Sequence, residues 1–268
     1  MNSFKQLGIV FNYEFLKHIR RARLYIILGI TLALEVLVLI LIPVLTHKGF
    51  PGDVKSMAAL LTIGPSLAGI GAVFFAGDAI AGEYESKTGF LLFINPIRRI
   101  VLWIGKYLAG LFSVTLLMIF NYIIIAIALL AIYHTVPWQM YESFGLATYY
   151  AAAVLSTTFF FSAASRGSMG ATIMSLLFVW VVSGILESVL SFTSNPTWFI
   201  LTAGARSIGT VYGGLQEFLS GLGLSGADLG NVGNFHIATP GMGAWGMTIY
   251  FVAGFLGSIF LARRRQLA

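Results

Sequence analysis

The sequence predicts an all-α polytopic membrane protein with six transmembrane helices, an N-terminal interfacial amphipathic helix and a re-entrant outer segment before the last span. Charged residues make up 10% of the 268 residues, against about 25% in soluble domains. Apolar residues make up 58%, and the mean hydropathy is +0.89. A soluble chain of this length cannot bury so much apolar surface, whereas a membrane protein exposes it to lipid. The apolar residues also gather in six long runs.

The first element, residues 1–23, has the pattern of an amphipathic helix that lies in the membrane interface. Ser3 and Gln6 have the spacing of a capping box, which favours a helix start. Apolar residues then recur at helical intervals, at Phe4, Leu7, Phe11 and Phe15. Such a helix would place its apolar face in the membrane surface. The alternative interpretation is a plain basic flank to the first span.

Six apolar runs are long enough to cross about 30 Å of hydrocarbon as helices. They cover residues 24–45, 57–80, 102–133, 145–164, 169–190 and 243–262. The third is long enough to tilt or to project beyond the bilayer. The first is too long for a cleaved signal peptide and lacks an A-x-A cleavage site. We therefore expect one six-span domain over residues 24–268.

Residues 191–242, between the fifth and sixth runs, form a glycine-rich and nearly uncharged stretch. Its middle, WFILTAGARSIGTVYGGL, is half apolar. The stretch is too short for an exterior domain and too apolar for a free loop. Short helices that dip back into the outer leaflet fit it best, because non-spanning backbone at membrane depth must be covered by protein.

The basic residues predict the orientation of the chain. If both termini lie in the cytoplasm, thirteen of the sixteen Lys and Arg residues fall on the cytoplasmic side, and only Lys48, Lys55 and Arg206 fall outside. The positive-inside rule favours this arrangement. It predicts a multi-pass protein of the cell (plasma) membrane, with residues 81–101 as a cytoplasmic loop between the second and third spans.

The composition also excludes several classes of function. The net charge of +6 does not indicate nucleic-acid binding, because the basic residues lie beside apolar runs instead of clustering on a solvated face. The chain contains no Cys, so it has neither disulfides nor thiolate metal sites. Its four histidines form no ligand-spaced pair: His18, His47, His134 and His236. We expect no metal and no other cofactor in this chain.

The stretch GDAIAGEYESKTGFLLFINPIRR, residues 77–99, is a charged island in this apolar chain. Its Lys-Thr pair is not a phosphate loop, because that motif requires a glycine before the lysine and a serine stands there. We expect no ATP-binding motif in this chain and no enzyme activity of its own. Glu83 and Glu85 do not predict an acid–base pair either, because residues two apart on a helix face different directions. We expect them to be solvated.

A second motif resembles a catalytic one. Residues 223–226 spell G-L-S-G, which resembles the nucleophile motif of rhomboid intramembrane proteases. A nucleophilic serine needs a base within hydrogen-bond reach. The histidine nearest to Ser225 in the sequence, His236, lies in the same polar loop instead of on another span. Proteolysis is therefore only a weak alternative.

From Asp78 to Lys106 the residues form a spaced pattern, which reads Gly82-Glu83-x-Glu85, Thr88, Leu91-Leu92, Pro96, Arg99 and Gly105-Lys106. This pattern resembles the first cytoplasmic loop in the permease subunits of class-two ABC transporters, the six-span and mostly exporting type. A six-span plan with both ends inside, an amphipathic N-terminal helix and an outer re-entrant stretch are also features of that family. Lys87 and Gly89 depart from its usual Gly and Leu.

The resemblance implies that the loop docks onto a separate cytosolic ABC ATPase, present in two copies, which binds ATP and Mg. It also implies a second permease subunit, a homodimer in preference to a heterodimer. The residues that the resemblance assigns to ATPase coupling are Asp78, Glu83, Glu85, Thr88, Phe90, Leu91, Pro96, Arg98, Arg99 and Lys106. A short helix ending at Pro96 would present Phe90 and Leu91 to a groove, inside a charged rim. The alternative is a solvated loop whose charges only set the topology.

Four polar residues in the spans are candidates for a transport pathway: Glu35, Asn121, Thr157 and Glu187. A carboxylate near the middle of a span costs about 2.5–3.5 kcal/mol on insertion scales, so Glu35 should face protein or a water-filled cavity. It is either a pathway residue or a structural contact, for example to Asn121, and the sequence leaves both open. Glu187 can reach the outer interface, and Thr157 fits helix packing better than a binding site.

These observations favour the membrane-spanning half-subunit of an ABC exporter. It would move an amphipathic or hydrophobic substrate outward across the membrane. The alternative is a non-transporting membrane protein. It would be a scaffold through which an ATPase performs mechanical work or, more weakly supported, an intramembrane protease.

Overall fold

The computed structural model describes residues 3–46, 49–85, 99–193, 195–213 and 239–264, which form helices and, within those ranges, no strand. Six helical segments are long and apolar enough to span a membrane: Ala22–Val44, Val54–Glu85, Ile100–Tyr133, Gln139–Ala164, Ser168–Phe192 and Pro240–Ala262. Each overlaps one of the six runs expected from the sequence. The predicted all-α, six-span fold class is confirmed.

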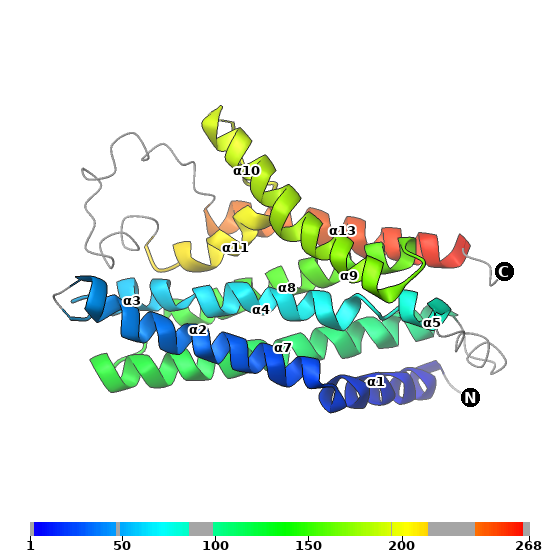
Figure 1. Cartoon of the computed structure of the whole chain (residues 1–268), viewed down its shortest axis with the longest axis horizontal. Helices are drawn as coiled ribbons and strands as arrows, with labels where there is room; N and C mark the ends of the chain where they lie inside the picture. Colours follow the sequence, from blue (N-terminus) through cyan, green and yellow to red (C-terminus); the bar gives the residue numbers. More distant parts are fainter. Residues whose placement is uncertain (1–2, 47–48, 86–98, 194, 214–238, 265–268) are drawn as a thin grey trace.

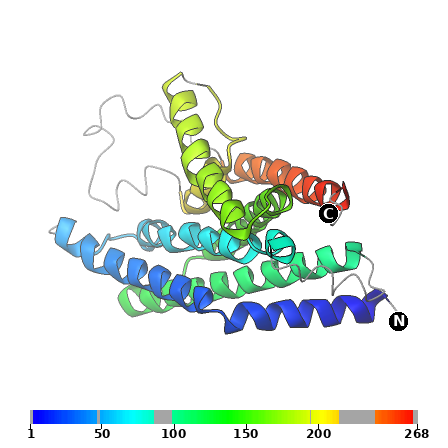
Figure 2. The same ribbon diagram turned by 45° about the vertical axis from the view of Figure 1, so that its right-hand side comes forward.

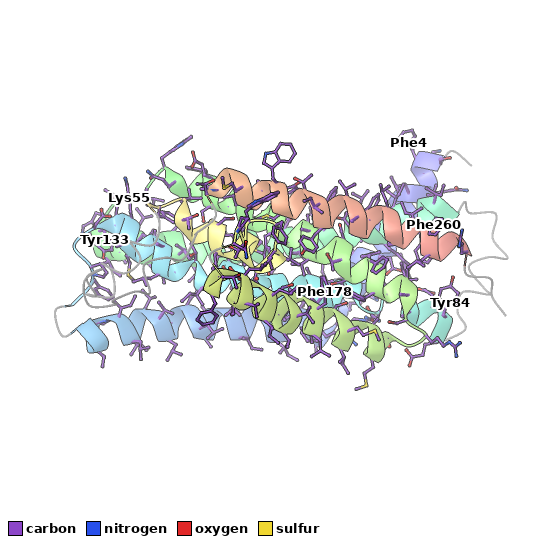
Figure 3. All side chains as sticks on the ribbon, turned by 90° about the horizontal axis from the view of Figure 1, so that it is seen from above. Phe4, Lys55, Tyr84, Tyr133, Phe178 and Phe260 are labelled. Atoms are coloured by element: carbon purple, nitrogen blue, oxygen red, sulfur yellow. The ribbon has the colours of Figure 1, made fainter. Side chains whose placement is uncertain are left out.

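The bundle consists of long helices that run side by side along its length (Figure 1). They are α2 (Ala22–Thr46), α4 (Ile63–Ala76), α7 (Arg99–Tyr133), α8 (Gln139–Ala164) and α13 (Pro240–Arg264). Helix α4 contacts α2, α7 and α8, and α13 packs along α8. Figure 3 shows Lys55 and Tyr133 at one end of the bundle and Phe4, Tyr84 and Phe260 at the other. We call these the α3 end and the α1 end.

The outside of the bundle carries large apolar side chains. On α2 they include Ile26, Ile30 and Leu37, and on α13 they include Ile249, Leu256 and Phe260. Such a surface is unfavourable in water and favourable against lipid chains. It agrees with a helix bundle that stands in a membrane.

The second span is broken, although the sequence predicted one continuous run over 57–80. Helix α3 (Val54–Leu61) ends at Thr62, and α4 begins at Ile63. Pro65 explains the break, because proline has no N–H to continue the helical ladder and its ring crowds the preceding turn. The hydroxyl of Thr62 donates to Ala59 O at 2.6 Å, and that of Ser66 donates to Thr62 O at 2.9 Å. Both carbonyls also accept from the backbone N–H of the same residue, at 3.3 Å for Ala59 O and 3.1 Å for Thr62 O, so each hydroxyl adds a second hydrogen bond at the break.

At the α1 end, a turn leads from α4 into the short helix α5 (Ala81–Glu85). Ser162 of α8 holds this turn in place. Its Oγ accepts from the N–H groups of Ile80 and Ala81 at 3.1 and 3.0 Å, and it donates to Gly77 O at 2.9 Å. One buried hydroxyl thus fixes the direction in which α5 leaves the second span.

The fifth span contains a π-helical segment. Helix α9 (Ser168–Leu176) passes into η1 (Leu177–Val182) and then into α10 (Ser183–Phe192). Ser183 Oγ donates to Phe178 O at 2.8 Å, five residues back. Beyond η1, α10 leans away from the other helices (Figure 2).

Two further helices complete the described chain. Helix α1 (Ser3–Arg20) lies along α7 at the α1 end, with Phe15 packed edge-on against Phe112 of α7 at 5.0 Å. Helix α11 (Leu201–Thr210), in the predicted re-entrant segment, packs against α8 and α13. That α1 lies in the membrane interface, and that the segment around α11 re-enters the membrane, stay predictions.

Candidate functional site

A buried lysine, Lys106, is the centre of a group of ion pairs at the α1 end. Its side chain, in the second turn of α7, is 1% exposed. Lys106 Nζ donates to Glu14 Oε1 of α1 at 2.5 Å and to Glu83 Oε1 of α5 at 2.8 Å. Lys17 Nζ lies 3.4 Å from Glu14 and 4.0 Å from Glu83. We call these four residues the Lys106 cluster.

The Lys106 cluster joins three helices that are far apart in the sequence: α1, α5 and α7. Its two carboxylates balance its two ammonium groups, which is the condition under which proteins tolerate buried charge. The expectation that Glu83 is solvated is therefore wrong, because α5 directs this side chain back against α7. Glu85, two residues on, is exposed.

The residue before the lysine, Gly105, lets α1 approach α7 closely. A Cβ atom built on Gly105 would lie 2.6 Å from Val10 Cγ1 of α1, which is too close for any real side chain. The adjacent pair Gly105-Lys106 thus has two roles at the same contact. Gly105 lets α1 lie close to α7, and Lys106 binds the Glu14 carboxylate of α1.

A second link joins the start of α2 to the end of the second span at the α1 end of the bundle. Arg21 Nη1 donates to Asp78 Oδ2, and Arg23 Nη1 lies 3.3 Å from the same oxygen. Both guanidinium groups are partly solvated, whereas the Asp78 side chain is mostly covered. The Asp78 carboxylate thus holds two arginines that follow directly after α1.

A third link joins α5 to the fifth span. Glu85 Oε2 accepts from Ser168 N at 2.8 Å and from Ser168 Oγ at 2.5 Å. Ser168 is the first residue of α9, where free backbone N–H groups and the helix dipole favour a negative charge. The short turn between α8 and α9 is thereby attached to the end of the second span.

His18, one turn after Glu14, is buried on the same face of α1. Its ring packs edge-on against Phe75 of α4, with ring centroids 5.1 Å apart. Burial lowers the pKa of His18 from 6.5 to about 4, although the carboxylates of Glu14 and Asp78 oppose this change. The imidazole is therefore neutral at physiological pH.

A cavity of about 360 Å³ opens beside the Asp78 link, between α2, α4 and α9. Arg23 and Asp78 line one part of it, and Phe74, Ile173 and Leu176 line another. The cavity thus offers charge and apolar surface together, a combination that suits an amphipathic molecule.

Several predicted residues lie outside the described part of the chain. They are Thr88, Phe90, Leu91, Pro96 and Arg98 of the loop, and Ser225 and His236 of the protease hypothesis. Arg99 begins α7, but its side chain also lies outside. The described residues of the charged island, Asp78, Glu83 and Glu85, all come together at the α1 end, with Lys106.

The four candidate pathway residues make no hydrogen bond to one another. Glu35 lies against Gly64 of α4, and neither of its carboxyl oxygens has a hydrogen-bond partner among the described residues. Asn121 Nδ2 donates to Leu117 O of its own helix at 2.8 Å. The contact between Glu35 and Asn121 that the sequence left open is therefore not a hydrogen bond.

The other two candidates lie on different elements. Thr157 Oγ1 donates to Ala153 O at 2.9 Å, and its backbone N lies 2.8 Å from a Cβ built on Gly254, where α13 crosses α8. Glu187 is 3% exposed and pairs with Arg206 of α11 at 3.2 Å. Helix α11 covers Glu187, so its carboxylate meets Arg206 instead of solvent; that it reaches the membrane interface stays a prediction.

Sequence reasoning missed Glu14 and Ser168. Glu14 is the only acidic residue in 1–23, and a lone acid on a basic helix was a usable signal for a specific partner. Ser168 carries no comparable signal, because its role depends on the turn that brings α9 beside α5. In the described part of the chain no cluster of three His, Asp or Glu residues can hold a metal.

A family model described as "ABC-2 family transporter protein" matches residues 9–202 of this chain. The matched part runs from the second turn of α1 to the start of α11 and includes all three links at the α1 end. The search of curated proteins found no match. Because the family model covers more than half of the chain, the chain belongs to the ABC-2 transporter family, as a membrane-spanning component of an ABC transporter.

Proposed function

We propose that this chain is the half-subunit of an ABC exporter, and that the α1 end couples it to a cytosolic ATPase. Family membership implies an ABC ATPase as partner. The observation that carries the coupling proposal is that both sides of segment 86–98 are tied to other helices. Before the segment, Glu83 is bound to Lys106 and Glu85 is bound to Ser168 of α9; after it, Lys106 of α7 is also bound to Glu14 of α1.

These links determine how a displacement spreads through the bundle. A partner that moves segment 86–98 also pulls on α1, α7 and α9, because the segment joins α5 to α7 and both are linked to the other two helices. Helix α7 has 35 residues and is therefore about 50 Å long. A rigid-body tilt at the α1 end thus moves the α3 end as well.

In the proposed cycle, two ATPase copies bind ATP and Mg²⁺, close, and displace the α1 ends of two permease chains. The α1 end faces the cytoplasm of the cell in this proposal, with both termini on that side. The excess of Lys and Arg at this end supports the orientation.

The substrate is an amphipathic or hydrophobic molecule that moves outward. The cavity between α2, α4 and α9 supports this class, because a charged pair and apolar side chains line the same space. The pathway lies between two copies of the chain, a homodimer. Within one chain, Glu35, Asn121, Thr157 and Glu187 are spread over four helices and contact different neighbours.

The test is co-purification from the native membrane. The tagged chain should retain a P-loop ATPase at a ratio of one to one. Replacing Phe90 and Leu91 with Asp should abolish this association while the chain still inserts, because the two apolar contacts with the groove are lost. Glu142→Lys, an exposed charge change in the first turn of α8 at the α3 end, is the matched control and should retain the ATPase.

Retention of the ATPase by the Phe90/Leu91 double variant would contradict the coupling proposal. Reconstitution of the complex in liposomes then separates transport from mechanical work. A transporter shows ATP-dependent movement of a fluorescent lipid across the bilayer, and the lipid stimulates ATP hydrolysis. A scaffold hydrolyses ATP without moving the lipid.

A further inference from the structure

The break in the second span faces a buried carboxyl group. Glu35, near the middle of α2, is 1% exposed. A Cβ atom built on Gly64 would lie 2.4 Å from Glu35 Oε1 and 2.9 Å from its Cγ. The carboxyl group therefore lies directly against the backbone of α4, two residues beyond Thr62, where α3 and α4 separate.

Neither oxygen of this carboxyl group has a hydrogen-bond partner among the described residues. Glu187 is the matched comparison within the same chain. It is also buried in a span, but its Oε1 lies 3.2 Å from Arg206 Nη1. One buried carboxyl group of the membrane-spanning helices is thus paired with a cation, and the other is not.

The helices packed against α2 supply no charge that faces Glu35. They are α1, α3, α4 and α7. Helix α4 contains no ionisable residue, and the only one in α3, Lys55, lies at the α3 end. The charged residues of α1 lie at the other end of the bundle, beyond Arg23. Arg23 is twelve residues from Glu35 along α2, about 18 Å away.

The ionisable residues of α7 have other positions or partners. Arg99 and Lys106 lie in its first two turns, and Lys106 is bound in its cluster. Tyr107 Oη is bonded to Ser156, Tyr122 Oη to Ser143, and Tyr133 Oη to Pro51 O. No group on the neighbouring helices is placed to neutralise an ionised Glu35.

An unpaired carboxylate is unfavourable inside a membrane protein, and such groups shed their charge by binding a proton. We propose that Glu35 is a proton-binding site at the break of the second span. It holds the proton as a neutral carboxylic acid in the conformation described here, and it releases the proton when α3 and α4 move apart and water enters.

The ligand is a proton and not a metal ion, because a metal site needs several ligating side chains. In the described part of the chain no group of three His, Asp or Glu residues gathers around Glu35 or elsewhere. The site is also independent of the proposed ATPase and substrate, since it rests only on α2, α3 and α4.

The break supplies the route for release. Pro65 removes one ladder hydrogen bond, and the hydroxyls of Thr62 and Ser66 add second hydrogen bonds to Ala59 O and Thr62 O, which also accept from backbone N–H groups. Hydroxyl bonds of this kind can be exchanged for water without unfolding α3 or α4. A small hinge motion at Thr62 therefore suffices to hydrate Glu35.

Infrared spectroscopy of the full chain in lipid nanodiscs tests the proposal, because it needs no reagent to reach the site. The spectrum at pH 7 should contain the C=O stretch of a protonated carboxylic acid. Glu35→Gln should remove this band, and Glu187→Gln should leave it in place. Identical carboxyl bands in the wild type and in Glu35→Gln would overturn the proposal, as would a band that responds to added sodium or potassium at fixed pH.

Transfer into D₂O tests the release step. Exchange of the acid proton shifts the band, so its rate reports how often water reaches Glu35. Pro65→Ala restores the missing N–H and should slow the exchange at least ten-fold. Gly241→Ala, on α13 and without neighbours within 4 Å of the added methyl group, is the control and should not change it. Equal exchange rates in the wild type and Pro65→Ala would refute release through the break.

Discussion

One oxygen of Glu85 accepts two hydrogen bonds from Ser168, at 2.8 Å from its N–H and 2.5 Å from its hydroxyl. This contact attaches the end of the second span to the first residue of the fifth. With Ser162 holding the preceding turn, the α1 ends of α4, α8 and α9 are fixed to one another.

Removing the charge of Glu85 should loosen this attachment. In Glu85→Gln the acceptor becomes a neutral amide, which interacts less favourably with the N–H groups and the dipole at the start of α9. Hydrogen exchange at the backbone amides of residues 168–171 should accelerate several-fold, and exchange in α13 should not change. Glu142→Gln is the control. Unchanged exchange at Ser168 would mean that the contact contributes nothing to the order of α9.

Lys106→Met should destabilise the α1 end. The substitution leaves Glu14 and Glu83 close together and without their cation, and removing one partner of a buried ion pair costs about 3–5 kcal/mol. The thermal midpoint of the detergent-solubilised chain should fall markedly. Lys55→Met, which removes a lysine without an ion pair in the described part of the chain, should change it little.

A compensating variant distinguishes charge from shape. The triple variant Glu14→Gln, Glu83→Gln and Lys106→Met removes all three charges and should recover most of the lost midpoint, since apolar or neutral replacements of buried ion pairs are tolerated. A triple variant that is no more stable than Lys106→Met would mean that packing, not charge, explains the loss.

Acidification should destabilise the chain through His18. The pKa of His18 is about 4 in the folded protein and 6.5 in the unfolded chain, so the unfolded chain binds the proton first as the pH falls. Neutral His18 contributes its full stabilisation above pH 6.5. This contribution is lost progressively toward pH 4, and the loss is at most about 2 kcal/mol at pH 5. Thermal midpoints from pH 7.5 to 4.5 should fall more steeply for the wild type than for His18→Gln. Parallel curves would refute the assignment.

Gly254→Ala should push α13 away from α8. A Cβ atom there would lie 2.6 Å from the carbonyl carbon of Ser156 and 2.7 Å from its oxygen, both backbone atoms that cannot turn aside. Overpacking of this kind costs about 1–3 kcal/mol. Gly241→Ala, on the same helix with open space around it, should be neutral or slightly stabilising in the same thermal assay.

The spans were predictable from the sequence because their signal is local. Twenty consecutive apolar residues determine a spanning helix regardless of its neighbours, so each expected run has its helix. The break at Thr62 was also visible in principle, since Pro65 stands inside the second run. Length and hydropathy alone do not reveal the break, because proline also occurs in spans whose other residues keep them helical.

The contacts at the α1 end were less predictable, because they depend on which helices meet. The pattern around Glu83 and Lys106 indicated a functional loop, but nothing in their spacing indicates that the two side chains bind one another. Glu14 joins them only because Gly105 admits α1 to the surface of α7. Similarly, Glu187 is paired because α11 folds back over α10, a long-range contact that no local pattern encodes.

The π-helical segment η1 determines the directions in which the side chains of the second half of the fifth span point. A π turn accommodates one residue more than an α turn, so the side chains of α10 are rotated by about 100° from the directions that an uninterrupted helix would give them. With this rotation Glu187 meets Arg206, while Ser168 at the other end of the span meets Glu85. Deleting one residue between Leu177 and Val182 would keep the span long enough for the membrane, yet only one of its two ends could then face its partner.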